Sequence, residues 1–131
     1  MGLSFEGSSC SMLVLITTHC FSSNKCNLQS VIINVNAVND PPGATNDSVS
    51  TNEDTPVNIV VLSNDSDPDS DTLTNTGLVS GSGPSSGTVM LNGDGETFDY
   101  TPYPNFHGQD SFVYTISDGN SGTSTATGAY Y

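Results

Sequence analysis

The fold is decided by the stretch GTVMLNGDGETFDY at residues 87–100. Apolar and polar residues alternate in its two runs, 87–91 and 96–100, and Asn-Gly-Asp-Gly stands between them. Alternation with a period of two is the pattern of a strand with one buried face, whereas a helix repeats about every 3.6 residues. Asn and Gly adopt the positive φ angles that tight hairpin turns require. The stretch therefore predicts a β-hairpin.

The same alternation recurs on both sides of this hairpin. Phe112, Tyr114 and Ile116 share one face of a run at 110–117, and the turn residues DGNSG follow it. The further strands predicted in this way are 28–38, 57–62, 73–80 and 123–127. Short strands at this spacing, separated by clusters of turn residues, are typical of an all-β sandwich.

The core of this sandwich is expected to consist of aliphatic and aromatic side chains on the inward faces of the strands. The predicted core residues are Ile59, Val61, Leu73, Val79, Val89, Leu91, Phe98, Tyr100, Phe106, Phe112, Tyr114 and Ile116.

The charge balance excludes two classes of partner. The 131 residues hold 14 acidic residues and one basic residue, which gives a formal net charge of −13. Such a chain cannot neutralise phosphates, so we expect it to bind no nucleic acid and no anionic membrane surface. No apolar stretch is long enough to insert into a membrane. An acidic surface of this kind is expected to attract cations.

The composition changes near residue 40. Residues 1–39 carry one acid and one base, whereas residues 40–131 hold the other 13 of the 14 acids and no base. All three cysteines lie in the neutral part, and their odd number leaves open whether they pair within the chain, crosslink chains or stay reduced. They are Cys10, Cys20 and Cys26.

The most distinctive motif is NDSDPDSD at residues 64–71, in which every second position is an aspartate. In an extended segment these carboxylates would point to one side, spaced by about 6.5 to 7 Å. Calcium takes six to eight oxygen ligands, mainly carboxylates and carbonyls, and would relieve the repulsion between them. Magnesium fits less well because it requires octahedral geometry and retains its waters. The motif therefore predicts a Ca²⁺ site with Asp65, Asp67, Asp69 and Asp71 as candidate ligands.

The site is not an EF-hand, because the glycine and the glutamate of that loop are replaced by Ser70 and Thr76. A solvated acidic loop that binds nothing is the alternative. Other acids also fall in predicted loops, and Asp110 and Asp118 bracket one strand at its opposite ends. Loops at one end of the sandwich are expected to gather several of these acids around one or two ions.

The chain resembles a cadherin-like, bacterial immunoglobulin-like tandem repeat of large calcium-dependent surface adhesins. The resemblance runs from NAVNDPP (36–42) through NEDTPVNIVVLSNDSDPDSDTLT (52–74) to residues 87–127 and covers about two thirds of the chain. It implies a seven-stranded Greek-key sandwich of the immunoglobulin/cadherin type. It also implies an extracellular or cell-surface location and repeats joined head to tail, with calcium at or near the junctions. A host or cell-surface ligand is a further expected partner.

The resemblance also assigns metal ligands. Asn39 and Asp40 match the linker motif, Glu53 matches the acid near the start of the repeat, and Asp67 and Asp69 match its Asp-x-Asp pair. On this reading the chain has three parts. Residues 1–28 are an irregular, unassigned segment, residues 29–42 are a strand and linker like the end of a preceding repeat, and residues 43–131 are the sandwich with a short last strand.

The two ends of the chain depart from the family pattern. The last strand is expected to be short because Gly128 interrupts it, while residues 29–42 are expected to form a strand that has no partner. Strand addition between subunits would pair the unpaired strand and complete the sheet that lacks its last strand. We therefore consider a self-polymerising filament in which residues 30–36 of one chain complete the sheet of the next. The interface residues would be Val31, Ile33 and Val35.

An enzyme is not expected. His107 lies in a predicted turn, and neither a nucleophile with its base nor a phosphate-binding glycine loop is recognisable. The third alternative is a carbohydrate-binding module, in which Tyr103 would stack against a sugar. The function favoured by the sequence is a non-catalytic, calcium-binding structural or adhesion module of a surface protein or extracellular fibre.

Overall fold

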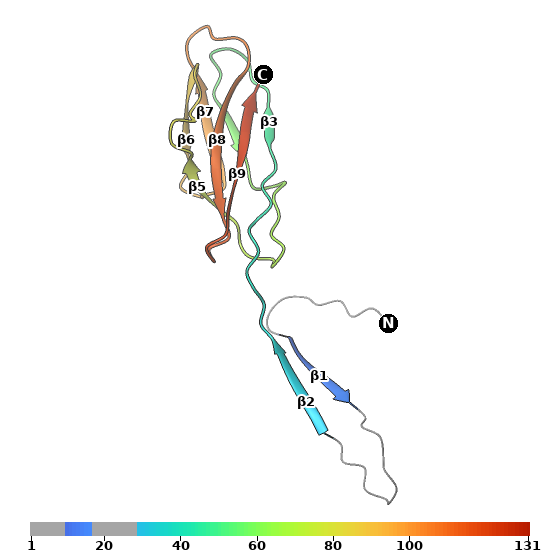
Figure 1. Cartoon of the computed structure of the whole chain (residues 1–131). Coiled ribbons are helices and arrows are strands. Elements are labelled where there is room, and N and C mark those ends of the chain that lie inside the picture. The colour runs from blue at the N-terminus through green and yellow to red at the C-terminus, as the bar shows by residue number, and fades with distance from the viewer. Residues whose placement is uncertain (1–9, 17–28) are drawn as a thin grey trace, which may run out of the picture. The chain divides into compact units, whose positions relative to one another are not determined.

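The computed structural model describes residues 10–16 and 29–131, and these form β-strands joined by turns and loops (Figure 1). Their nine strands are β1 (Cys10–Ile16), β2 (Gln29–Val35), β3 (Asp47–Val49), β4 (Val57–Val60), β5 (Thr74–Leu78), β6 (Gly87–Leu91), β7 (Thr97–Pro102), β8 (Asp110–Ser117) and β9 (Thr123–Tyr130). No helix in the described part of the chain is long and apolar enough to cross a membrane.

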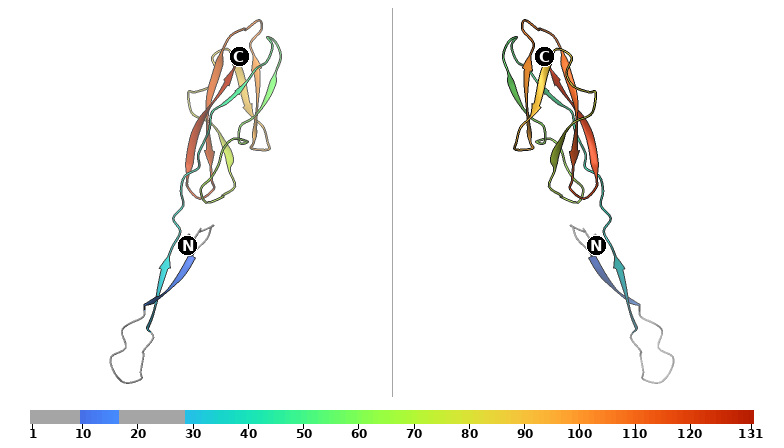
Figure 2. Two further views of the ribbon diagram at one scale, coloured as in Figure 1. Left: turned by 90° about the vertical axis from the view of Figure 1, so that its right-hand side faces the viewer. Right: turned by 90° about the vertical axis from the view of Figure 1, so that its left-hand side faces the viewer.

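The chain divides into two compact units, 1–38 and 39–131. The second unit contains a four-stranded sheet in the order β3-β9-β8-β5 and a three-stranded sheet in the order β4-β7-β6. Figure 2 shows the strands of this unit from two sides. The predicted all-β sandwich is thereby confirmed, and so is the hairpin at 87–100, which forms β6 and β7.

The core lies between these two sheets and is largely aromatic. Phe98 and Phe112 meet edge to face with their ring centroids 4.9 Å apart, while Tyr100 and Tyr130 stack at 3.9 Å. Seven of the predicted core residues are buried: Ile59, Val61, Phe98, Tyr100, Phe112, Tyr114 and Ile116. Leu91 was wrongly placed in the core, because its side chain is 37% exposed near the end of β6.

The last strand is longer than the sequence predicted. β9 pairs with β8 over eight residues and reaches Tyr130, so Gly128 does not interrupt it. A Cβ atom at position 128 would lie 2.7 Å from Phe112 Cζ, which means that the glycine makes room for this ring. The strand also buries Ala126 and Tyr130, two core residues that the sequence did not predict. The expected deficit at the end of the sandwich is therefore absent.

The first unit contains an antiparallel pair of strands. β2 pairs with β1 along its whole length, from Ile16 opposite Gln29 to Cys10 opposite Val35. The expectation of a strand without a partner was therefore wrong, and β1 lies within the segment that was expected to be irregular. Val31 and Ile33, the expected donor residues, take part in this pairing, and Val35 is 59% exposed. Cys20 and Cys26 lie outside the described residues.

Candidate metal centre

Three segments that are distant in the sequence meet at one end of the sandwich. They are the entry segment at 39–43, the loop between β4 and β5, and the turn between β8 and β9. Gly43 forms an antiparallel bridge with Ser66, which fixes the entry segment against the β4–β5 loop. The Asn120 side-chain amide donates a 2.8 Å hydrogen bond to Asp71 Oδ2, which joins the turn to the same loop.

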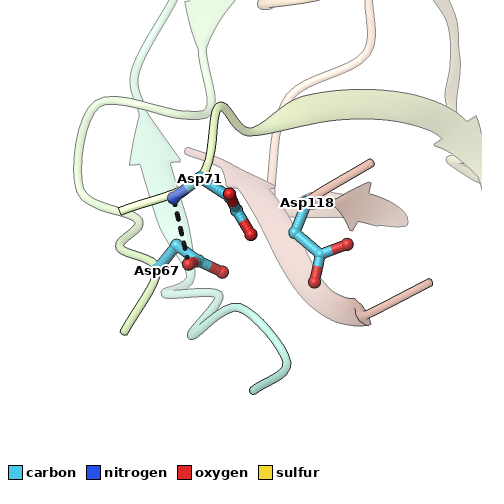
Figure 3. A group of neighbouring side chains, drawn as sticks. All are labelled: Asp67, Asp71 and Asp118. Atoms are coloured by element: carbon cyan, nitrogen blue, oxygen red, sulfur yellow. Dashed lines mark hydrogen bonds between the residues drawn. The ribbon is translucent and has the colours of Figure 1, made fainter. Parts of the chain in front are cut away.

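Asp67, Asp71 and Asp118 form the carboxylate group of this end (Figure 3). One carboxylate oxygen from each residue lies within 4.8 Å of the other two. Asp67 Oδ1 accepts hydrogen bonds from the backbone amides of Asp69, at 2.8 Å, and Asp71, at 3.1 Å. Asp67 Oδ2 is buried and has no partner within the described chain. This oxygen is consequently free to bind an ion.

Asp118 is the most enclosed member of the group, with 4% of its surface exposed. Its Oδ1 accepts hydrogen bonds from the amides of Asn120, at 2.7 Å, and Gly122, at 2.9 Å, which closes the turn after β8. The Asn39 side chain donates to Oδ2 at 2.8 Å. This donation, followed by the two amides, lowers the pKa of Asp118 below its usual value of 3.8, so the carboxyl stays ionised at neutral pH. A Cβ atom at position 122 would collide with Asp118 Oδ2, which explains the glycine.

Asp69 and Asp40 are not members of the carboxylate group, and they bond to each other. The backbone amide of Asp40 donates a 2.7 Å hydrogen bond to Asp69 Oδ2. Asp69 therefore anchors the entry segment, and the two predicted ligands contact each other through this bond.

Asp65 does not belong to the group. Its Oδ1 accepts the amide of Thr45 at 2.7 Å, and its Oδ2 is buried without a partner in the described chain. Burial raises the pKa of Asp65, and the Thr45 hydrogen bond offsets only part of that effect. The expectation that all four aspartates face one side is wrong because the segment is not extended: Ser70 has a φ of 64° and its amide bonds to the Asp67 carbonyl.

Glu53 lies elsewhere in the domain. It follows β3 and lines a cavity together with His107 and Tyr100. His107 precedes the first residue of β8, whereas Asp118 follows its last residue, and so the structure does not bring Glu53 to the carboxylate group. The sequence analysis named Asp118 among the loop acids but did not select it as a candidate ligand. Its signal was its position at the first residue of the DGNSG turn, where an aspartate side chain commonly accepts amides two residues on.

The carboxylate group fits a hard divalent cation. All of its donor atoms are oxygens, which calcium prefers. Calcium–oxygen distances of about 2.3 to 2.6 Å separate two ligands on opposite sides of the ion by about 4.6 to 5.2 Å. The 4.8 Å limit on the oxygen separations is compatible with that range.

Comparison with known proteins finds a similar sequence and partly similar structures. Protein GAMETE EXPRESSED 2 of Arabidopsis thaliana is 32% identical over 125 residues, which are 94% of this chain but only 13% of that protein. A nucleoside hydrolase-related protein from Saccharophagus degradans aligns over 72% of this chain and 26% of its own, with a TM-score of 0.49 and 16% identity. An endo-fucoidan hydrolase of glycoside hydrolase family 107 aligns over 95% of this chain and 22% of its own, with a TM-score of 0.46 and 16% identity.

The family is shown by a match to the bacterial Ig domain. This match spans residues 39–128, from Asn39 in the entry segment to Gly128 in β9, and so it includes the whole carboxylate group. Bacterial Ig domains are structural modules and are typically extracellular. The chain belongs to the bacterial Ig domain family.

Proposed function

We propose that residues 39–131 are a non-catalytic structural module of a cell-surface adhesin or extracellular fibre, stabilised by a calcium ion at Asp67, Asp71 and Asp118. The family membership supports the structural and extracellular part of the proposal. His107 is exposed in the loop before β8, at the opposite end of that strand from Asp118, and this separation of the histidine from the carboxylates supports the absence of catalysis.

The observation that carries the calcium proposal is the convergence of three carboxylates from two segments. Ionised carboxylates at this separation repel one another, and no Lys or Arg stands within residues 40–131 to compensate them. The partnerless oxygen of Asp67 leaves a buried polar atom unsatisfied, which is costly unless an ion or water binds it. A divalent cation removes both penalties.

Calcium at this position would act on the folded domain as a whole. The ion binds the assembled carboxylates and has little affinity for the unfolded chain, so it stabilises the fold by about 2.7 kcal/mol at a hundredfold excess over its dissociation constant. Asn39 and Asp40 bond to Asp118 and Asp69, so the ion would also strengthen the attachment of the entry segment. A module stiffened at its entry suits a protein built of repeats joined head to tail, which is the arrangement that we propose.

The experiment is calorimetric titration of the full chain with CaCl₂ at physiological salt. We expect saturable binding that Asp118→Asn weakens at least about tenfold, because the variant removes one of the three charges. Glu96→Gln removes one exposed charge from the β6–β7 turn and serves as the matched control. Equal affinity in the wild type and Asp118→Asn would refute the proposed site.

A further inference from the structure

A second candidate site lies near the start of β8, where Glu53 is found. It is a cavity of about 420 Å³ between the loop that follows β3, the loop that precedes β8, and the end of β9. A volume of this size lies within the range of pockets that hold small ligands or single side chains. The carboxylate group, which adjoins the other end of β8, contributes no residue to it.

The cavity combines an aromatic floor with an acidic rim. Tyr100 and Tyr130 form the floor and are 1% and 2% exposed, while Tyr131, beside them, is 55% exposed. The Tyr130 hydroxyl has no hydrogen-bond partner within the described chain. A phenol oxygen can accept as well as donate a hydrogen bond, so the floor leaves one polar group for a ligand to satisfy.

The loops around the cavity are held in place before any ligand arrives. The backbone amide of Asn105 donates a 2.8 Å hydrogen bond to Asp54 Oδ1, which joins the two loops directly. Both residues have positive φ angles, 59° and 60°, a conformation that asparagine and aspartate tolerate better than most residues. The Thr51 amide also bonds to the Tyr131 carbonyl at 3.3 Å. Binding would therefore cost little ordering of the loops.

The negative charge at the cavity favours a cationic ligand. The Glu53 side chain is exposed at the rim, and residues 40–131 contain no Lys or Arg that could neutralise it. The net charge of −13 favours the approach of a cation over that of a neutral or anionic ligand. Phe106 and Tyr131 add aromatic surface, against which a planar cation or a long aliphatic stem can pack.

We propose that this cavity binds a basic side chain, preferably arginine, presented by a partner protein. The guanidinium would pair with the Glu53 carboxylate in the bidentate geometry that arginine favours, and its planar face would lie against the aromatic surface. A lysine would supply the charge but not the second hydrogen bond. This interaction is independent of the calcium site, since the two share no residue.

The test is a pair of fluorescently labelled peptides, Gly-Arg-Gly and its citrulline analogue, titrated against the full chain at low and physiological salt. Citrulline keeps the size and planarity of arginine but has no charge. We expect the arginine peptide to bind more tightly, with an advantage that shrinks as salt rises. Glu53→Gln should weaken arginine binding about fivefold, the upper range for an exposed ion pair, and Glu96→Gln should leave it unchanged.

Two outcomes would overturn this proposal. One is equal binding of the arginine and citrulline peptides, which would make the cavity a site for neutral ligands such as saccharides. The other is unchanged arginine binding in Glu53→Gln, which would place the interaction on another part of the acidic surface. Because the Glu53 side chain is exposed, Glu53→Gln should fold. The comparison of the arginine and citrulline peptides uses the wild-type chain and so does not depend on the folding of that variant.

Discussion

The Asn39 side-chain amide donates a 2.8 Å hydrogen bond to Asp118 Oδ2, which ties the first residue of the domain to the turn after β8. The bond joins residues 79 positions apart. It places an amide from the entry segment beside one of the three carboxylates of the proposed metal centre. The start of the domain and its candidate ion site are therefore parts of the same local structure.

The first prediction concerns this bond. In Asn39→Ala the donor is lost, so the pKa of Asp118 should rise toward its usual value of 3.8. The change can be measured by following the side-chain carboxyl of Asp118 by NMR as the pH is lowered. Asn52→Ala, an exposed substitution in the loop near the other end of the domain, is the control and should leave that titration unchanged. A pKa that stays low in Asn39→Ala would show that the two turn amides alone hold the carboxylate.

The second prediction concerns Gly128. Gly128→Ala places a Cβ atom 2.7 Å from Phe112 Cζ, and this ring already packs against Phe98 and Tyr130. Overpacking of this kind should lower the free energy of unfolding by about 1 to 3 kcal/mol. Denaturant unfolding measures the loss. Gly93→Ala, in the β6–β7 turn with open space around its Cβ position, should change stability little, and equal losses at both sites would contradict the packing argument.

The third prediction concerns acid stability. Burial raises the pKa of Asp110, but donations from the amides of Ser85, Ser86 and Ser111 outweigh it, and the pKa falls below 3.8. The stabilisation from a lowered carboxyl pKa is present above the unfolded value and is lost as the pH falls through the folded value. Asp110→Asn should therefore reduce the loss of stability below about pH 4 in the absence of calcium. Urea unfolding across the acid range measures this slope, and an unchanged slope would contradict the role of Asp110.

The fourth prediction concerns alkaline pH. Burial, together with the hydrogen bond from its hydroxyl to Asp110 Oδ2, raises the pKa of Tyr100 to about 12. The unfolded chain releases this proton near 10, so the corresponding stabilisation is complete below that pH and is lost as the pH rises toward the folded value. Phenolate absorbance of the folded chain, followed as the pH is raised, should lose a late step near pH 12 when Tyr100 is replaced in Tyr100→Phe. An alkaline titration that is the same in the wild type and in Tyr100→Phe would be inconsistent with this prediction.

The strands were predictable because their signals are local. The bounds of β6 and β8 coincide with the alternating runs at 87–91 and 110–117, each of which carries its own apolar pattern and is followed by turn residues. β9 was predicted too short because Gly128 looks like a break in the sequence. Only the tertiary structure shows that Phe112 occupies the space of the missing side chain.

The carboxylate group was predicted in part for a similar reason. The motif at 64–71 drew attention to the correct loop, but its spacing describes an extended chain, and the turn at Ser70 changes which carboxylates converge. Asp118 comes from a distant turn, so no local pattern joins it to Asp67. Glu53 was assigned by resemblance alone, which carries over the residue type but does not say near which end of the domain it lies.

The most direct test of the calcium proposal is thermal unfolding of the full chain at physiological salt, in excess CaCl₂ and in EDTA. Binding at a hundredfold excess over the dissociation constant should raise the midpoint by on the order of 10 °C. MgCl₂ should have a much smaller effect, and the variant with Asp67→Asn and Asp118→Asn should lose most of the calcium effect, whereas Glu96→Gln should keep it. The same midpoint in calcium and in EDTA would contradict the account, because the three carboxylates would then be a solvated surface and not an ion site.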